Sequence, residues 1–252
     1  MEFRDPFSSP QTGALGQTEA VGFDAGLRAY MLRIYNYMAS ALALTGVVAM
    51  VTANSPALLQ VFYVFREGQI VGVSGLSWFI ALVTFGLGMW LILGIRSMSK
   101  TTALTLYWSY AILTGISFSS IFLAYTGASI ARTFFVTAGV FGGMSIYGYT
   151  TKRDLTGIGY FLIMGLFGLI IATIVNWFLR SAGLDFVLSV IGVIIFTGLT
   201  AYDTQKFKDI YYQGSGSTEA MAKASIIGAF NLYLDFILLF RYLIDFMGQQ
   251  RR

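Results

Sequence analysis

The stretch Gly157–Phe178 reads GIGYFLIMGLFGLIIATIVNWF and contains no charged side chain and no proline. A transmembrane helix needs about 20 mainly apolar residues to cross a hydrocarbon layer of about 30 Å. This run reaches that length without interruption, so it predicts a helix that spans a lipid bilayer. It decides the fold class, because one such helix makes the chain an integral membrane protein.

Similar apolar blocks lie on both sides of this run. We predict six further spans: Tyr30–Thr52, Gly75–Ile95, Ala103–Ala124, Thr133–Tyr149, Phe186–Thr204 and Ser225–Met247. The chain is 56% hydrophobic and only 11% charged, whereas about a quarter of the residues in soluble domains are charged. We therefore expect an all-α integral membrane protein with seven transmembrane helices. The alternative is six spans followed by a re-entrant last segment.

The segment before the first span has a different composition. Residues 1–25 are polar, hold two of the three prolines and contain no long apolar run. This composition is typical of a disordered tail and not of a signal peptide. We predict a disordered cytoplasmic tail at residues 1–25 and a seven-helix transmembrane domain at residues 26–252. On the fourth span, Gly139 and Gly143 form a small-residue face that favours close approach of a helix, unless their spacing is chance in a glycine-rich chain.

The basic residues predict the orientation, because Lys and Arg are enriched in cytoplasmic loops. The richer side has Arg28, Arg33, Arg96, Lys100, Lys152, Arg153, Lys206, Lys208 and Lys223, and the poorer side has Arg66, Arg132, Arg180, Arg251 and Arg252. This excess places the N-terminus in the cytoplasm. With seven spans the C-terminus then lies outside, although its two terminal arginines argue weakly against that placement.

The chain contains no cysteine and no histidine. It therefore has no disulfide framework, and it lacks both the commonest metal ligand and the usual pH switch. Its net charge of +4 comes from residues scattered at helix ends, which is not the footprint of a nucleic-acid-binding protein. Any metal binding or pH response must rest on carboxylates, and we expect neither a resident cofactor nor an enzyme.

Three aspartates lie inside the predicted spans, namely Asp203, Asp235 and Asp245. A charge at the bilayer centre costs about 2.5–3.5 kcal/mol on the insertion scale, so such residues face protein or water and usually mark a pathway. Asp245 follows Arg241 by four residues, and an ion pair on the same helix accounts for it. Asp203 and Asp235 lie on predicted helices that are antiparallel neighbours. Their place inside the membrane is explained either by a structural ion pair or by a function.

If the carboxylates of Asp203 and Asp235 meet, we expect them to share one proton and to titrate as a unit. Like charges repel, and burial disfavours the charged form. The pair would then respond to pH without histidine. Arg96 ends the second span, and its guanidinium can bind a carboxylate through two parallel hydrogen bonds. Arg96 is therefore either a partner of the pair or a cytoplasmic anchor.

The segments Ala201–Gln205 (AYDTQ) and Asn231–Ile237 (NLYLDFI), which contain these aspartates, resemble the Bax inhibitor-1 family, also called the transmembrane Bax inhibitor motif family. Thr114–Phe122 (TGISFSSIF) and Tyr149–Asp154 (YTTKRD) resemble it as well. The resemblance covers residues 25–248 and looks closest to the bacterial branch. Its motifs lie on several helices, so the resemblance is specific.

The resemblance implies a seven-helix fold with the last helix central. It also implies a pH-sensitive calcium leak channel in the bacterial inner membrane. In that family an aspartate pair on the sixth and seventh helices is the pH sensor, and Asp203 and Asp235 match its positions. Arg96 matches the arginine that engages the pair in the closed form. Some members carry an acid about three turns earlier in the second helix, whereas Gly75–Ile95 has none, which leaves calcium selectivity open.

Taken together, these residues suggest a gate. Arg96 would close the cytoplasmic mouth by pairing with the ionised Asp203–Asp235 unit, and acid would neutralise the unit and release Arg96. Calcium or another cation crossing the pore would contact the carboxylate oxygens of Asp203 and Asp235, because hard cations prefer oxygen ligands.

Other functions compete with this hypothesis. An intramembrane aspartyl protease needs a Gly-x-Gly-Asp motif and a later Pro-Ala-Leu element, but Leu232-Tyr-Leu234 precedes Asp235 and Pro56 is the last proline. A zinc-dependent seven-helix hydrolase needs histidines, and a retinal protein needs a lysine that residues 225–247 lack. Two alternatives stay open: a non-conducting regulator that binds other membrane proteins, such as a membrane protease, and a proton-coupled carrier.

Overall fold

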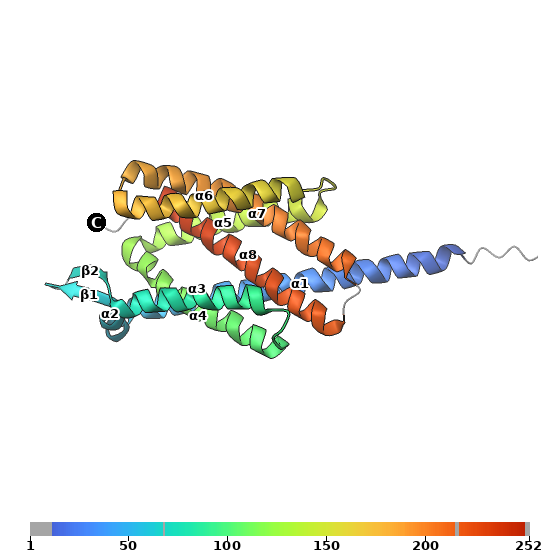
Figure 1. The fold of residues 1–252 in the computed structure, drawn as a ribbon, viewed down its shortest axis with the longest axis horizontal. Helices are drawn as coiled ribbons and strands as arrows, with labels where there is room; N and C mark the ends of the chain where they lie inside the picture. Colours follow the sequence, from blue (N-terminus) through green and yellow to red (C-terminus); the bar gives the residue numbers. More distant parts are fainter. Residues whose placement is uncertain (1–11, 68, 215–216, 250–252) are drawn as a thin grey trace, which may run out of the picture.

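The computed structural model describes residues 12–67, 69–214 and 217–249. Within these ranges the chain forms eight helices and one two-stranded hairpin (Figure 1). In chain order they are α1 (Thr12–Asn54), α2 (Pro56–Phe62), β1 (Tyr63–Arg66), β2 (Gln69–Val73), α3 (Gly75–Gly94), α4 (Lys100–Ala124), α5 (Gly127–Thr150), α6 (Thr156–Leu179), α7 (Ala182–Gln213) and α8 (Thr218–Met247). β1 and β2 pair antiparallel and connect α2 to α3.

Seven of these helices, α1 and α3 to α8, are long and apolar enough to cross a membrane. This result confirms the predicted all-α membrane fold, and each predicted span coincides with one of them. Polar residues mark the helix starts. Ser99 accepts a hydrogen bond from the N–H of Thr102 at the start of α4, and Thr126 accepts one from Ser129 at the start of α5. Such caps satisfy backbone donors that the first turn of a helix leaves free.

The helices alternate in direction between two ends of the bundle, which we call the N-side and the C-side. The turns α3–α4, α5–α6 and α7–α8 lie at the N-side, from which α1 projects (Figure 1). The hairpin and the end of α8 lie at the C-side (Figure 1). α8 is one unbroken helix between the two ends, so the alternative with a re-entrant last segment is not the observed fold.

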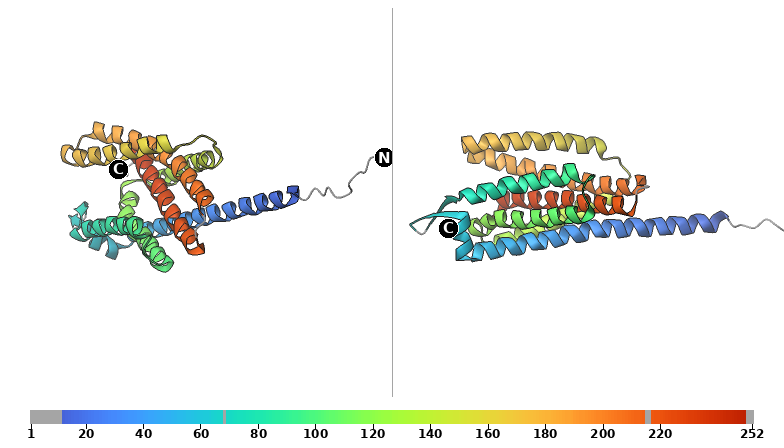
Figure 2. Two further views of the ribbon diagram at one scale, coloured as in Figure 1. Left: turned by 45° about the vertical axis from the view of Figure 1, so that its right-hand side comes forward. Right: turned by 60° about the horizontal axis from the view of Figure 1, so that its bottom comes forward.

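α8 is the central helix, as the family resemblance implied. It packs against α1, α4, α5 and α7, and it crosses the bundle between the α3–α4 pair and the α6–α7 pair in two views (Figures 1 and 2). Phe230, Leu232 and Leu239 on α8 are fully buried. By contrast, large apolar side chains on the outer helices are exposed, such as Phe161 and Phe178 on α6. A buried centre and an apolar outer surface suit a bundle surrounded by lipid.

Two parts of the chain differ from the sequence predictions. The predicted spans end at Thr204 and resume at Ser225, but α7 continues to Gln213 and α8 begins at Thr218. The apolar pattern fades in these polar turns, whereas helical hydrogen bonding continues beyond the hydrocarbon layer. The segment between the first two spans also contains α2 and the hairpin, which are too short and too weakly patterned to stand out in the sequence.

The structure describes only part of the predicted tail. Residues 1–11 lie outside the described residues, and α1 begins at Thr12, so the extent of a tail at residues 1–25 stays a prediction.

Close helix contact occurs at different glycines from those that the sequence suggested. Side chains added at Gly139 or Gly143 would meet no described atom within 4 Å, so neither position contacts a neighbouring helix here. At Gly148 of α5, by contrast, an added Cβ would collide with the backbone of Ala201 on α7. The missing side chain at Gly148 lets α5 approach α7 beside Asp203.

Candidate functional site

Asp203 and Asp235, the two aspartates predicted to act together, both lie inside the helix bundle. Asp203 is on α7 and Asp235 is on α8, and only 9% and 4% of their surfaces are exposed. α7 and α8 are neighbours along the chain and pack against each other. The short connection at residues 214–217 makes them antiparallel, which brings both aspartates to one region of the bundle.

The two carboxyl groups act on each other through space. Like charges repel in a poorly solvated interior, so a negative charge on Asp203 disfavours one on Asp235. No hydrogen bond joins the two carboxyls in this conformation, and Oδ2 of Asp235 is buried without any hydrogen-bond partner. A buried carboxyl oxygen without a partner is unusual, because it forgoes the hydrogen bonds that water would give it. It therefore calls for a functional explanation.

Lys206, whose position in the sequence indicated only a topology marker, is the cation that contacts the pair. Its Nζ lies 3.7 Å from Oδ1 of Asp203, one turn away on α7. The same ammonium lies 5.8 Å from the ring centre of Tyr202 and 5.6 Å from that of Phe207. The stem of Lys206 therefore stays near the bundle while its charge meets Asp203. Lys206 follows Asp203 by three residues, and residues at this spacing are neighbours on a helix surface. This spacing is the sequence signal that could have identified the contact.

Three hydroxyl groups lie near Asp203, two on α7 and one on the neighbouring α5. Oγ of Ser145 lies 3.3 Å from Oγ1 of Thr204. Thr204 donates to the carbonyl oxygen of Thr200 at 2.8 Å, and Thr200 donates to that of Phe196 at 2.7 Å. All three hydroxyl residues are buried. Because both threonine hydroxyls donate their proton within α7, their oxygens can act toward other groups only as hydrogen-bond acceptors or ligands.

Arg96, the third predicted site residue, lies apart from the aspartates in this conformation. It follows α3 at the N-side, where a cavity of about 590 Å³ is bordered by the ends of α3, α7 and α8. Glu219 and Lys223 line the same cavity and form an ion pair of 3.2 Å. Arg96 is exposed, and no carboxylate of the described residues lies within 4.0 Å of it.

A second polar contact fixes the rotation of α8. The hydroxyl of Tyr233 lies 2.8 Å from Oγ1 of Thr45 on α1, and Thr45 donates to the carbonyl oxygen of Ala111 on α4 at 3.0 Å. The single proton of Thr45 is then used, so Tyr233 is the donor to Thr45. Two residues correspond to roughly 200° around a helix, so with Tyr233 facing α1 and α4, Asp235 faces the opposite side, toward α7.

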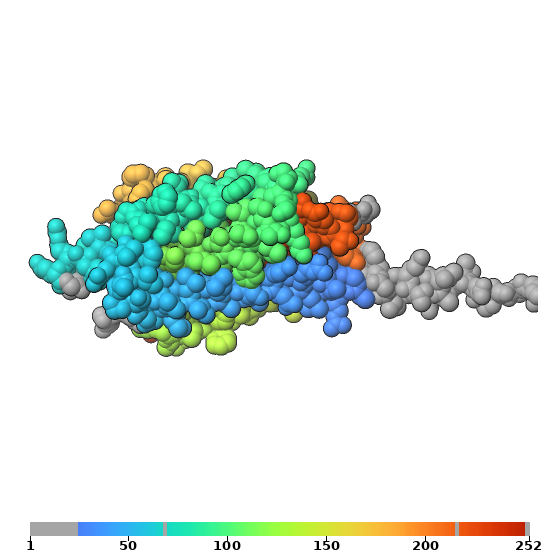
Figure 3. Space-filling view, turned by 90° about the horizontal axis from the view of Figure 1, so that it is seen from below, coloured from blue at the N-terminus to red at the C-terminus, as the bar shows by residue number. Residues whose placement is uncertain are grey.

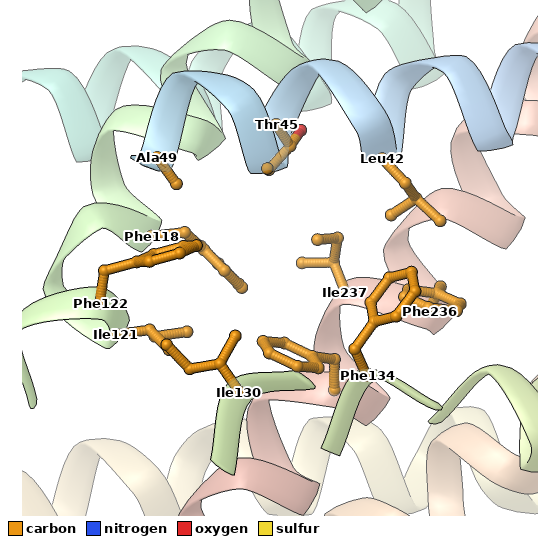
Figure 4. A pocket seen from close by; sticks show the side chains of 12 residues that line it. Leu42, Thr45, Ala49, Phe118, Ile121, Phe122, Ile130, Phe134, Phe236 and Ile237 are labelled. Carbon is orange, nitrogen blue, oxygen red and sulfur yellow. The ribbon is translucent and has the colours of Figure 1, made fainter. Parts of the chain in front are cut away.

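An apolar cavity lies on the C-side of the bundle between α1, α4, α5 and α8 (Figure 4). Its volume is about 100 Å³. Phe236 and Ile237, the two residues after Asp235, point into it together with Phe118 and Phe134. Thr45 contributes its one labelled oxygen (Figure 4). This cavity offers a dissolved ion almost no ligands.

Asp245, the third acid of the predicted spans, has the partner that its sequence position predicted. Nε of Arg241 lies 3.0 Å from Oδ2 of Asp245, which confirms the ion pair on the same helix. Tyr125 also donates to Asp245 at 3.0 Å. In the described part of the chain, no three acidic side chains gather closely enough to hold a metal ion. The protein ligands of a resident metal at this site would therefore be limited to the oxygens of two carboxylates and nearby hydroxyls.

Gln205 anchors the α5–α6 turn next to the site. Its side-chain oxygen accepts from the N–H of Leu155 at 2.8 Å, and its side-chain nitrogen donates to the carbonyl oxygen of Arg153 at 2.8 Å. In the same turn, hydrogen bonds from Thr156 lower the pKa of Asp154 below its ordinary value. The turn that carries Lys152 and Arg153 is thereby fastened to α7, two residues from Asp203.

The chain is similar to membrane proteins of several bacteria. Residues 27–252 match the family described as "Inhibitor of apoptosis-promoting Bax1". An uncharacterized protein of Rickettsia prowazekii is 49% identical over 229 residues, which cover 91% of this chain and 93% of that protein. The inner membrane protein YbhL of Escherichia coli K12 is 46% identical over 231 residues, covering 90% and 94% of the two chains. An uncharacterized membrane protein of Streptococcus pyogenes is 31% identical over 229 residues, covering 90% and 95%.

Proposed function

This chain belongs to the Bax inhibitor-1 family, and from that premise we propose that it is a pH-sensitive leak channel for calcium or other cations. Its location would be the bacterial inner membrane, as the name of its relative YbhL suggests. The N-side would then face the cytoplasm, because the excess of Lys and Arg lies there. The aspartate pair would be the pH sensor.

The observation that carries this proposal is the burial of two aspartates on adjacent transmembrane helices. Asp203 and Asp235 are nearly inaccessible, and one oxygen of Asp235 lacks a partner. Placing two acids there opposes membrane insertion, and a purely structural role would pair them more completely. Proton uptake relieves the repulsion between them, so the number of protons on the pair changes with pH.

Arg96 would supply the latch. At higher pH the pair is ionised, and a guanidinium brought to it gains a charge-assisted hydrogen bond worth about 1.5–3 kcal/mol. As pH falls, the pair becomes neutral while Arg96 keeps its charge, so the latch weakens. The contact would shift a two-state population roughly tenfold to a hundredfold. The described conformation, with Arg96 in the N-side cavity, would be the unlatched position of this residue.

The position of α3 supports such a movement. α3 packs mainly on α4, and only Thr84, Gly88 and Leu91 are buried along it. A helix with so few buried contacts can shift at low cost relative to α8, which is buried on several sides. Arg96 follows α3 directly and would travel with it toward the pair.

The apolar cavity would be the barrier to ions on the C-side of the pair. A hydrophobic constriction blocks conduction because a dehydrated ion finds no ligands there and water leaves readily. The carboxylates, with the hydroxyl oxygens of Thr200 and Thr204, would give a passing cation the oxygen ligands that calcium prefers. Calcium is then the cargo, and protons compete with it for the same oxygens.

The test is calcium flux into liposomes that contain only this protein, measured from mildly alkaline to acid pH. We expect the flux to rise as pH falls. A flux that is absent at every pH would contradict the channel and favour a non-conducting regulator. Saturable uptake of a solute coupled to proton movement would instead indicate a carrier.

A further inference from the structure

A groove runs along the outside of the bundle between α1 and α5. Its volume is about 620 Å³, and its walls include Leu32, Tyr35 and Met38 of α1 and Phe141, Gly142 and Ile146 of α5. Both helices rest on α7 and α8, which form the base beneath them. In Figure 3, α1 crosses the visible face with α4 along one side and α5 along the other.

The groove opens sideways, toward the lipid. Leu32 on one wall is 49% exposed and Ile146 on the other is 67% exposed. Its lining is almost entirely apolar, so water is a poor occupant. An apolar groove that opens to the hydrocarbon layer suits a flexible apolar chain.

The length of the groove matches one leaflet of a bilayer. On α1 the groove extends from Arg28 to Met38. These residues are ten positions apart, which corresponds to about 15 Å at 1.5 Å per residue. Half of a hydrocarbon layer of about 30 Å is about 15 Å as well. The groove begins at the N-side end of the membrane span and stops near its middle, which is the extent of a lipid chain and not of a transmembrane helix.

The N-side end of the groove is basic. Arg28 lines it, and no carboxylate of the described side chains lies within 4.0 Å of its guanidinium. Across the groove, Lys208 lies against Tyr149, another lining residue. Its Nζ donates to the carbonyl oxygen of Tyr149 at 2.8 Å and lies 5.9 Å from the ring centre. The N-side end of the groove therefore has one cation on its wall and a second bound to another wall residue.

We propose that the α1–α5 groove binds one anionic glycerophospholipid of the N-side leaflet, with an acyl chain against Gly142 and the phosphate between Arg28 and Lys208. The apolar walls accept the chain, and the two cations select a net negative headgroup over a zwitterionic one. The base of the groove includes Ser145, which contacts Thr204 beside Asp203, so the bound lipid lies one residue layer from the aspartate pair.

Gly142 gives a sharp test, because a side chain there enters open space. An added Cβ would meet no described atom within 4 Å at Gly142, and the same is true at Gly143. Gly142 lines the groove, whereas Gly143 does not. Gly142→Phe should therefore fill the groove without disturbing the fold, and Gly143→Phe is its matched control on the same helix.

The full-length chain, purified in detergent, is incubated with phosphatidylglycerol or phosphatidylcholine of identical acyl chains, and bound lipid is counted by native mass spectrometry. We expect phosphatidylglycerol to be retained at lower concentrations than phosphatidylcholine. Arg28→Gln and Lys208→Gln should each weaken phosphatidylglycerol binding about fivefold, and Lys100→Gln, a distant N-side cation, should not. Gly142→Phe should reduce retention of both lipids, whereas Gly143→Phe should retain them. Leu32→Trp, from the opposite wall, replaces Gly142→Phe if that variant does not fold.

Equal retention of the two lipids by the unchanged protein would overturn the proposal. So would unchanged retention in both groove-filling variants. A dimer that dissociates in Gly142→Phe would show instead that a second copy of this chain occupies the groove. Lipid counting involves no ion flux, so its outcome is independent of the proposed leak.

Discussion

Nζ of Lys206 lies 3.7 Å from Oδ1 of Asp203, one turn further along α7. The lysine side chain is 40% exposed while that of Asp203 is 13% exposed, so the pair joins the buried interior to the N-side surface. In this conformation Lys206, and not Arg96, holds the position of counter-charge to the aspartates.

Removing the charge of Lys206 should move the pH response of the flux. Without a cation beside it, Asp203 keeps its proton to higher pH, so Lys206→Gln should shift the midpoint of the flux toward alkaline pH. The shift should reach up to about 0.7 pH unit, because a partly exposed ion pair is worth at most about 1 kcal/mol. Flux measured against pH in liposomes gives the midpoint, and Lys100→Gln is the matched control. A midpoint that stays in place would show that Lys206 does not influence the sensor.

Neutralising either aspartate should flatten the pH dependence of the flux. Asp203→Asn and Asp235→Asn each remove a partner from the shared proton, so the double variant should add little to either single one. The measurement is flux across the pH range for the three variants. Asp209→Asn, two turns further along α7, should keep the pH dependence. Additive effects of the two single changes would mean that the carboxyls titrate independently.

Replacement of Arg96 separates a latch from an anchor. Arg96→Ala should raise the flux at mildly alkaline pH toward its acid level, because the ionised pair loses its latch. Arg96→Lys keeps the charge but lacks the planar fork of the guanidinium, so it should raise that flux only in part. If folded Arg96→Ala protein leaks no more than the original at alkaline pH, Arg96 serves topology alone.

The absence of cysteine makes the orientation simple to measure. Single cysteines at Ser99, Lys152 and Ser215 should react only from the cytoplasm, and one at Arg66 only from outside. Ser215 lies outside the described residues, between α7 and α8. Labelling of intact cells with a membrane-impermeant maleimide reports the side. A cytoplasmic label at Arg66, or an external one at Lys152, would reverse the proposed orientation.

The anchor formed by Gln205 should contribute measurably to stability. Gln205→Met keeps the volume of the side chain but removes its hydrogen bonds to Leu155 and Arg153. The buried N–H of Leu155 is then left without a partner, at about 1–3 kcal/mol. The unfolding midpoint in detergent should therefore fall. Gln213→Met, at the exposed end of the same helix, should leave the midpoint nearly unchanged. Equal midpoints for the two variants would show that water replaces the lost bonds.

The number of spans could be predicted because the bilayer sets one length scale, and a long apolar run such as Gly157–Phe178 satisfies it directly. The aspartates stood out for a related reason: an acid inside an apolar run is costly and therefore conspicuous. The polar turns beyond Thr204 gave no such signal, since hydropathy reports the membrane and not the helix. α7 therefore extends further than the apolar pattern indicated.

Contacts between helices could not be predicted, because they depend on rotation and vertical shift as well as on position along the chain. The hydrogen bond between Tyr233 and Thr45 links residues 188 positions apart, and no local sequence pattern at either residue predicts it. Arg96 and Asp203 both lie near the N-side ends of their predicted spans, yet α7 continues beyond Asp203 to Gln213 and Arg96 lines a separate cavity. Lys206 was readable in principle from its spacing on α7, but it also fits the pattern of a topology marker.

The burial of α8 has a consequence for biosynthesis. Translation proceeds toward the C-terminus, so the central helix α8 leaves the ribosome after the other six described spans. Until it inserts, inward-facing residues such as Ile34 on α1 and Tyr107 on α4 lack the core against which they pack. The six earlier spans must therefore remain in the bilayer without their central packing partner until α8 inserts. A premature stop within α8 (Thr218–Met247) would remove the centre of the bundle and not its edge.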